Sequence, residues 1–405
     1  AALSGCAAIL EGDTWVEAPH SATPYVRPEM EQTKVSNYDE FKGALYDLVM
    51  QHEESGMIIY YSYDTDVQGE IDLACAEIKG TDPVGAYSVS EIIVIPTRIV
   101  TYFEIDISIE YKRTTQQVES IVPVATLREL RDELLIIMSN YQDEAVFRTA
   151  MPGVTAEDIE IYVRETYYQN PRNIVMKPGM TVEIFPEGGY DRVFELRFGN
   201  TQQAGILRQY SASLSESVRR NAEAANGDNA AEILLSLAEN LIGACFYDEG
   251  KAKVISEHGT QNIATTAYGA LVVGSAVGEG FAMAYKALCE ELGFDCRIVL
   301  GYLDGMVHAW NIVPIYGDYY HIDVSMCAEN GIETAFLKTD EDFEESYIWD
   351  TENAASCHGT LTYEDVAGIL PEDETGEDGL ALYTADDGEE VPAPFTADDG
   401  EEAPE

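Results

Sequence analysis

The sequence has few basic residues for its length. Its 405 residues include 23 Lys and Arg against 74 Asp and Glu, which gives a formal charge of −51 at pH 7. A negative field of this size argues against DNA, RNA and anionic lipid surfaces as partners, because they are bound through Lys and Arg. The content of apolar residues, 46%, is nevertheless high enough for two or three folded domains.

Long apolar runs are also absent from the sequence. There is no run of 18 or more apolar residues, so we predict no transmembrane helix. The stretch Leu3-Ser4-Gly5-Cys6 resembles the end of a bacterial lipoprotein signal, without the charged and apolar regions that precede such a site. We therefore predict a lipid on Cys6 and a tether at the outer face of a bacterial membrane. An unmodified Cys6 left from another export signal is the alternative.

The seven cysteines form no CxxC pair and show no zinc-type spacing. We predict no metal and no cofactor, and the neighbours Cys357 and His358 favour a metal only weakly. Cys75 and Cys289 lie in helical patterns beside apolar residues, so we expect them to be small core residues. The cysteine spacing does not define any disulfide pairing.

Composition divides the chain after the first six residues into four parts. Residues 7–36 contain Pro, Thr and Glu without a period and are predicted to be a linker. Residues 37–200 and 201–370 are predicted to be folded regions. Residues 371–405 contain no Lys or Arg and repeat the heptapeptide TADDGEE, which predicts a disordered acidic tail.

The first folded region, 37–200, contains an internal repeat. The order helix, strand, helix, strand, strand occurs twice, with an offset of roughly 85–90 residues. One strand is expected within 98–113, where every second residue is apolar, as in a strand with one wet face. Those apolar residues are Phe103, Ile105, Ile107 and Ile109. We predict two copies of one α+β unit, or one domain built from both, with a structural or ligand-presenting role.

The second folded region contains a helix in a position typical of thiol enzymes. Residues 274–296, GSAVGEGFAMAYKALCEELGFDC, predict a helix from near Gly278 to near Gly293 with a buried face. A helix N-terminus lowers the pKa of a thiol, and a nearby His and a third orienting group complete such a site. Here the first helical position holds glycine, which has no nucleophile to offer.

The next stretch predicts a pair of strands that carries a His and an Asp. Residues 308–324, HAWNIVPIYGDYYHIDV, place His308 and Asp323 on one face of a hairpin. A tight turn at Gly317-Asp318 would stagger the two side chains by about four residues, roughly 13 Å along the strand. Contact would then require a longer turn or a bulge, so the spacing alone leaves the pair open.

These two stretches, together with FLKTDEDFEESYIWD at 336–350, resemble the bacterial transglutaminase-like family over about 265–350. The resemblance implies an α+β domain of the papain-like, transglutaminase type, with a helix bundle and an antiparallel sheet. It places the family's nucleophilic Cys on Gly278, its His on His308 and its Asp on Asp323. The preceding region is similar to the companion domain of such lipoproteins.

Loss of a nucleophile removes orders of magnitude of rate, so we expect this domain to be inactive or severely impaired. Other side chains that could serve as the nucleophile are poorly placed. Cys289 lies 11 residues on, roughly 16 Å along the helix, and Cys296 lies beyond the helix end. Ser275 would need a different loop geometry to face His308. The expected function is to bind a peptide, a protein or cell-wall material in the former catalytic cleft.

Two other functions stay open at this point. The first is a thiol peptidase or transamidase whose parent carries Cys at 278, replaced by nature or by design. The second is a structural component of a surface assembly, which suits the repeated unit and the acidic tail, with the oligomeric state undefined. We expect His321 to be an ordinary surface or core residue. Trp310 and Trp349 are expected to be packing aromatics, with lining of the cleft as the alternative.

Overall fold

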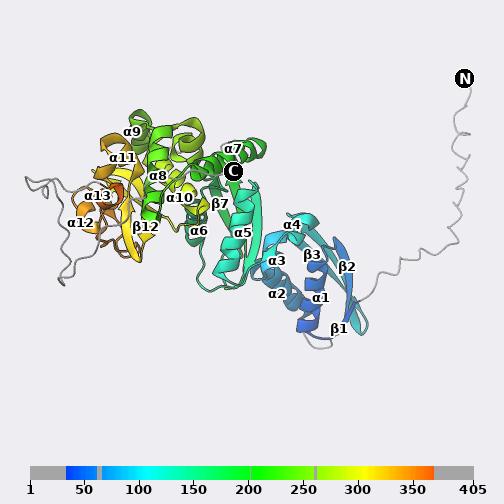
Figure 1. Cartoon of the computed structure of the whole chain (residues 1–405). Coiled ribbons are helices and arrows are strands. Elements are labelled where there is room, and N and C mark those ends of the chain that lie inside the picture. The colour runs from blue at the N-terminus through cyan, green and yellow to red at the C-terminus, as the bar shows by residue number, and fades with distance from the viewer. Residues whose placement is uncertain (1–32, 62–65, 201, 260–261, 369–405) are drawn as a thin grey trace, which may run out of the picture. The chain divides into compact units, whose positions relative to one another are not determined.

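The computed structural model of the chain is shown in Figure 1. The predicted lipidation site Cys6, most of the predicted linker 7–36 and the acidic tail 371–405 lie outside the residues that it describes. None of the described helices has the length and hydrophobicity needed to cross a membrane. The described residues are 33–61, 66–200, 202–259 and 262–368. They divide into two compact units, the first formed by residues up to Met138, Gln142–Val163 and Pro178–Thr201, the second by Ser139–Tyr141, Arg164–Lys177 and the residues from Gln202 on.

The first unit contains two four-stranded sheets with equivalent strand order, β1-β2-β4-β3 and β5-β6-β8-β7. In each sheet the first pair is parallel and the other two pairs are antiparallel. The strands are β1 (Thr33–Val35), β2 (Ser55–Tyr60), β3 (Val89–Ile99), β4 (Tyr102–Tyr111), β5 (Val122–Pro123), β6 (Glu144–Thr149), β7 (Gly179–Phe185) and β8 (Arg192–Gly199). The helices are α1 (Tyr38–Met50), α2 (Val67–Gly80), α3 (Pro83–Ser88), α4 (Thr115–Glu119), α5 (Leu127–Ser139) and α6 (Ala156–Gln169), the last two of which end in the second unit.

The two sheets belong to the two copies that the sequence predicts. The first residues of α1 and α5, Tyr38 and Leu127, are 89 residues apart, and β4 and β8 begin 90 residues apart. Each copy also begins with a short parallel strand that was not predicted, because three or two residues give no periodic signal. The first of these, Thr33–Val35, lies within the predicted linker 7–36.

Alternation along β4 explains the core of the first copy. The apolar residues of this strand turn toward α1 and α2, which cover one face of the sheet (Figure 1). Helical spacing on these two helices provides the facing side chains. The residues buried together include Ile105, Ile107 and Ile109 of the strand and Phe41, Leu45 and Ile71 of the helices. The expected strand at 98–113 begins later, because residues 100 and 101 form the turn between β3 and β4.

The second unit is built around α10 (Gly278–Glu291), whose residues from Gly280 to Cys289 are all buried. This helix contacts α7, α8, α11 and strand β12 of an antiparallel sheet with the order β13-β12-β11-β14. The α+β prediction of helices packed with an antiparallel sheet is therefore confirmed. The remaining helices are α7 (Ala204–Glu223), α8 (Ala230–Ala244), α9 (Glu249–His258), η1 (Ile263–Thr265), η2 (Gly269–Val273), α11 (Val324–Asn330), η3 (Ile332–Thr334), α12 (Asp340–Phe343) and α13 (Tyr363–Ala367). The strands are β9 (Phe246–Tyr247), β10 (Ser275–Ala276), β11 (Arg297–Leu303), β12 (Met306–Ile315), β13 (Asp318–Ile322) and β14 (Tyr347–Trp349).

Two segments beside α10 differ from the sequence expectation. Gly269–Val273 form a turn of π-helix that was not predicted. Helix α9 was not predicted, because it buries none of its residues and so lacks an apolar stripe. Close packing fixes the start of α10: a Cβ on Gly280 would lie 2.3 Å from the carbonyl oxygen of Ala264.

Candidate functional site

The hairpin of β12 and β13 turns one residue earlier than expected. Ile315 pairs with Asp318, so Tyr316 and Gly317 are the two turn residues. Their φ angles of 54° and 104° both lie in the left-handed region, as in the primed turns that match the twist of a hairpin. The expectation of a turn at Gly317-Asp318 was therefore wrong.

This shift of the turn changes the stagger between the His and the Asp. Asn311 pairs with Ile322, and the same register places Asp323 opposite Trp310, two residues from His308 rather than four. Diagonal neighbours at this offset lie on one face and within side-chain reach. The structure brings the two together, with 2.6 Å between Nε2 of His308 and Oδ2 of Asp323.

Asp323 is a buried carboxylate that accepts five hydrogen bonds. Oδ2 accepts from Nε2 of His308 and from the hydroxyl of Tyr347 at 3.0 Å. Oδ1 accepts from the backbone N–H and hydroxyl of Ser325 and from the backbone N–H of Met326, which makes Asp323 the N-cap of α11. Burial alone would raise the pKa of Asp323, but the charge of His308 and these hydrogen bonds lower it.

The bond to Asp323 fixes the orientation of the His308 ring. Because a carboxylate only accepts, Nε2 carries the proton, and Nδ1 of the neutral ring keeps its lone pair. Among the described residues Nδ1 has no hydrogen-bond partner. Burial alone would lower the pKa of His308, but the adjacent charge of Asp323 and the hydrogen bond raise it. This arrangement suits a general base whose free nitrogen is Nδ1.

Nδ1 of His308 faces the start of α10. A Cβ built on Gly278 would lie 2.6 Å from Nδ1 and 2.4 Å from Cε1 of His308. The first helical hydrogen bond runs from the N–H of Phe281 to the carbonyl of Val277, so the preceding N–H groups point out of the helix end. The start of the helix thus offers backbone donors and a partial positive charge, but no side chain, near His308.

The possible substitutes for a nucleophile do not reach His308. Cys289 and Cys296 are fully buried, and burial raises the pKa of Cys289 well above its usual range. The hydroxyl of Ser275 donates to Asp248 at 3.0 Å and accepts from Lys251 at 3.1 Å, so it is engaged elsewhere. No side chain considered for the role is therefore in position to be activated.

Two cavities meet at His308. One of about 290 Å³ includes Gly278 and Glu279 in its walls, and the other, of about 640 Å³, lies between α9, α11 and the start of β12. Both are also lined by Tyr247, Ala252 and Val307. His308 thus lies at the border between the two cavities.

A tyrosine from the end of α6 closes part of the smaller cavity. The hydroxyl of Tyr168 donates to Oε1 of Glu279 at 2.9 Å. Burial raises the pKa of both groups, with the negative charge of Glu279 adding to the effect on Tyr168. The two residues are 111 positions apart, and no sequence pattern indicates their contact.

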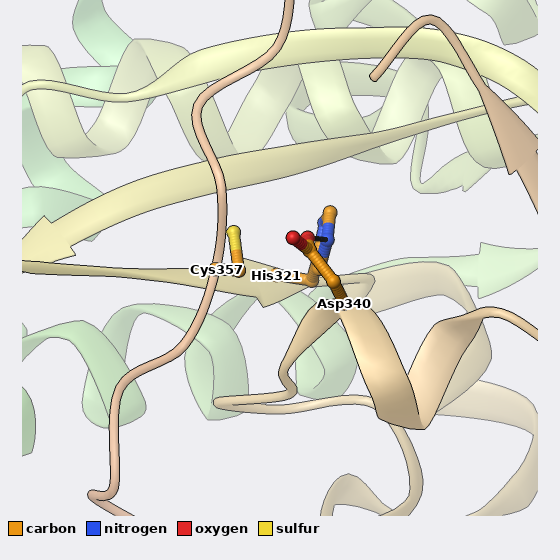
Figure 2. A group of neighbouring side chains, drawn as sticks. All are labelled: His321, Asp340 and Cys357. Carbon is orange, nitrogen blue, oxygen red and sulfur yellow. Dashed lines mark hydrogen bonds and ion pairs between the residues drawn. The ribbon is translucent and has the colours of Figure 1, made fainter. Parts of the chain in front are cut away.

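A second cluster of polar side chains lies behind the site. Figure 2 shows His321, Asp340 and Cys357, whose possible ligand atoms lie within 4.8 Å of one another. The indole N–H of Trp310 donates to Nδ1 of His321 at 3.0 Å. An indole only donates, so the proton of neutral His321 must lie on Nε2, which donates to Asp340 at 2.9 Å. A protonated Nε2 cannot bind a metal, so the pattern favours a hydrogen-bond relay over a metal site.

The structure gives the other singled-out residues packing roles. His321 is fully buried and is therefore a core residue, and burial lowers its pKa. Trp310 is fully buried and packs edge-on against Trp349. Neither tryptophan lines the two cavities at His308. His358 is exposed, with Nε2 3.8 Å from a carboxylate oxygen of Asp340.

Sequence reasoning missed several partners of the site. Ser325 had a local signal, since Asp is a favoured N-cap residue whose carboxylate accepts from the N–H groups of the following helical turn. Tyr347 had none, because it lies 24 residues from Asp323 and reaches it only through the pairing of β14 with β11. The acidic residues around the larger cavity also come from separate elements.

A helix start, a His–Asp pair and an antiparallel sheet lie together in the second unit. The model of the Transglutaminase-like superfamily matches residues 215–324, which include Gly278, His308 and Asp323. This part of the chain is a transglutaminase-like domain. No curated protein matches the sequence.

Solved structures resemble the chain only distantly. A TGase crystal structure is 8% identical over 51% of this chain and 59% of its own, with a TM-score of 0.27. A candidate cysteine protease from Cytophaga hutchinsonii is 15% identical over 45% of this chain and 74% of its own, with a TM-score of 0.24. A candidate protease from Parabacteroides distasonis is 7% identical over 70% of this chain and 43% of its own, with a TM-score of 0.21. The chain therefore spans less than two thirds of the first and third structures, and the family match alone supports the domain's identity.

Proposed function

We propose that the transglutaminase-like domain is catalytically inactive and binds a peptide, a protein segment or cell-wall material in the cleft at His308. One observation carries the proposal: Gly278 occupies the helix start that faces Nδ1 of His308, and it has no side chain. In this reading Gly278 stands where the family's nucleophilic Cys would stand. A base without a nucleophile leaves only binding and the helix-end donors, so orders of magnitude in rate are lost.

The packing at Gly278 supports the same conclusion. The His308 ring lies so close to the helix start that a Cβ would fall 2.4 Å from Cε1. The space that a nucleophilic side chain would need is therefore filled by the imidazole. A thiol at this position would require the ring to move away from a bond of 2.6 Å to Asp323.

Exposed apolar side chains support a binding role. Leu300, Tyr302 and Val307 line the smaller cavity and are 43%, 48% and 69% exposed. Apolar residues gathered around a cavity, with a few polar groups, are typical of ligand sites. The cleft thus retains a surface for a ligand although it lacks a nucleophile.

The test compares the natural chain with Gly278→Cys and Gly278→Ala. The two variants introduce the same Cβ beside His308, so only the thiol distinguishes them. We expect the natural chain and Gly278→Ala to incorporate no amine and to cleave no peptide. Alkylation of Gly278→Cys by iodoacetamide across pH reports whether His308 lowers the pKa of the new thiol.

The outcomes separate the proposal from its rivals. Turnover by the natural chain above that of Gly278→Ala would refute the proposal. Turnover by Gly278→Cys together with a lowered thiol pKa would support an intact frame and a thiol enzyme as parent. If the thiol of Gly278→Cys reacts like free cysteine, His308 and Asp323 are no longer arranged for catalysis. Filaments or rings in size-exclusion chromatography would instead favour the structural alternative.

We also propose that the protein is a secreted bacterial lipoprotein, which a lipid on Cys6 anchors at the outer face of the cell membrane. The support is the stretch Leu3-Ser4-Gly5-Cys6 in the sequence. Mass spectrometry of the N-terminal peptide from membranes of a cell that exports the full precursor tests this. A diacylglycerol mass on Cys6, lost in Cys6→Ser, is expected, and an unmodified thiol would contradict the proposal.

A further inference from the structure

Two buried cysteines lie where the last turn of α10 meets the start of β11. Cys289 belongs to the last turn of the helix, and Cys296 directly precedes the strand. Both side chains are fully buried. The thiol of Cys289 is hydrogen-bonded to the thiol of Cys296, so the two sulfur atoms are in contact. In the structure both are free thiols.

A hydrogen-bonded turn at the end of α10 brings the two cysteines together. The N–H of Phe294 donates to the carbonyl of Cys289 at 2.9 Å, and the N–H of Gly293 donates to the carbonyl of Glu290 at 3.1 Å. Gly293 has a φ of 82°, so these bonds form a Schellman motif, which reverses the chain at a helix end. Cys296 therefore returns alongside the helix instead of continuing away from it.

A buried lysine holds the returning segment at Cys296 itself. Nζ of Lys286 donates to the carbonyl oxygen of Cys296 at 2.7 Å and also pairs with Glu290. Lys286 is 7% exposed. Because residues three apart share a face of a helix, Lys286 and Cys289 both face the returning segment. The position of Cys296 beside Cys289 is thus fixed by contacts other than those of the thiols.

The other buried cysteines of this unit have different partners. The thiols of Cys245, Cys327 and Cys357 donate to backbone carbonyl oxygens at 3.6, 3.4 and 3.6 Å. The thiol of Cys289 lies instead beside a second thiol and the hydroxyl of Tyr285. A disulfide requires two neighbouring backbones whose cysteine side chains point toward each other. Cys289 and its partner have that arrangement.

We propose that Cys289 and Cys296 form a disulfide in an oxidising environment and that this bond fastens the end of α10 to the start of β11. The inference goes beyond the proposed function and does not depend on it. Each thiol gives up one electron and one proton as the sulfur–sulfur bond forms. The oxidant is another disulfide, such as oxidised glutathione, which takes up the two electrons and two protons and becomes two thiols.

The burial of the two thiols determines when this bond forms. Burial raises the pKa of Cys289 well above its usual range, and exchange with an oxidant requires an accessible thiolate. The bond therefore forms during folding, before α10 is covered, and resists reducing agents afterwards. It acts on the candidate site, because α10 begins opposite His308 and β11 forms part of the wall of the smaller cavity.

The first experiment maps the bond in the full natural chain. The reduced, unfolded protein is refolded with reduced and oxidised glutathione, unfolded again without reductant, labelled with iodoacetamide and cleaved by trypsin. Trypsin cuts after Lys286 and Arg297, so both cysteines lie on the peptide 287–297. We expect this peptide to carry no label and to lack two hydrogen atoms, and to be labelled at both cysteines only after reduction. The peptides that contain Cys245 and Cys327 should be labelled without reduction.

Two results of this mapping would overturn the inference. The first is a peptide 287–297 labelled at both cysteines before reduction, because the pair then stays reduced in the presence of an oxidant. The second is a bond from either cysteine to Cys327 or to glutathione. Neither ligand binding nor a lipid on Cys6 enters this experiment, so failure of the proposed function would leave its result unchanged.

Melting temperatures of matched variants test the bond a second way. The natural chain refolded with oxidised glutathione should melt about 5 °C higher than the same chain refolded with dithiothreitol, because a cross-link restricts the unfolded chain. Cys296→Ala should lose this difference, and Cys327→Ala, which also removes a buried thiol, should keep it. Each variant is compared with itself under the two conditions, so a general loss of stability cancels. A difference that persists in Cys296→Ala would overturn the assignment to this pair.

Discussion

The backbone of Gly278 and the imidazole of His308 are packed against each other: a Cβ on Gly278 would lie 2.4 Å from Cε1 of the ring. The ring is held in place by the bond of 2.6 Å from its Nε2 to Asp323. The imidazole and the helix start therefore meet without room for a side chain between them. This contact makes glycine a packing requirement of the present structure, and the helix start has no side chain to face the ring.

Replacement of Gly278 by Ala should destabilise the protein. The added methyl group must push back a buried ring, and overpacking of this kind costs about 1–3 kcal/mol. Urea unfolding followed by circular dichroism measures the change. Gly243→Ala is the matched control, because a Cβ at Gly243 of α8 meets nothing within 4 Å. That variant should be neutral or stabilised by up to about 1 kcal/mol. Equal stability of both variants would contradict the packing at His308.

The titration of His308 should depend on Asp323. In the natural chain its pKa is raised above the ordinary 6.5, and in Asp323→Asn it should fall below 6.5, because burial remains while the main opposing charge is gone. The NMR shift of the His308 Cε1 proton across pH measures both values. Glu329→Gln, which removes a weaker contribution, should lower the pKa less. A pKa that stays unchanged in Asp323→Asn would contradict the pairing.

The same pair predicts how stability depends on pH. A raised pKa in the folded state means that the contribution of protonated His308 is fully present below about pH 6.5. The contribution decreases as the pH rises through the folded-state pKa. The free energy of unfolding from urea titrations should therefore fall over this range. Asp323→Asn should remove this decrease in the free energy of unfolding. If the variant shows the same decrease, titrating groups other than His308 cause it.

The hydrogen-bond relay of Trp310, His321 and Asp340 should stabilise the fold and bind no metal. Asp340→Ala leaves the buried N–H of His321 without its acceptor, which costs about 1–3 kcal/mol. Glu341→Ala, at the exposed neighbouring position, should change stability by less than about 0.5 kcal/mol. Zn²⁺ added to the natural chain should not raise its melting temperature, because Nε2 of His321 carries a proton. A rise abolished by both Asp340→Ala and Cys357→Ala would show that the cluster binds metal.

A substitution in the turn between β12 and β13 is expected to stabilise the protein. Tyr316 is exposed and has a φ of 54°, a conformation in which Asn is favoured over most other residues. Tyr316→Asn should therefore raise the midpoint of urea unfolding, by about 0.5–1 kcal/mol in stability. Gly317→Ala should lower it by about 1–2 kcal/mol, because Gly317 has a φ of 104°. The reverse order of the two midpoints would contradict the register of this hairpin.

Long periodic elements of this fold could be predicted from the sequence. The helix at Gly278, the alternating strand with Ile105 and Ile107, and the repeated order of elements all follow from apolar periodicity. Elements without such a signal were missed: β1 and β5 are too short, and α9 buries none of its residues. Their positions depend on tertiary contacts that no local pattern encodes.

The candidate site could be predicted only in part, because its geometry depends on one turn. Moving the turn from Gly317-Asp318 to Tyr316-Gly317 changes the stagger of His308 and Asp323 by two residues, and that decides whether they touch. The turn residue Tyr316 gave no signal, since a tyrosine with positive φ is uncommon. Tyr347 and Glu329 reach the site through the fold of distant segments, so the sequence could not place them there.

Asp323 stabilises two parts of the fold: it orients His308, and it caps α11 through Ser325 and Met326. A substitution there would damage the folding of the domain even if the protein performed no reaction. In a lineage that had lost its catalytic thiol, purifying selection for stability alone would retain this aspartate. Retention of a His–Asp pair in such a chain is therefore no measure of enzymatic activity, and surveys that infer activity from surviving catalytic residues would misjudge proteins built this way.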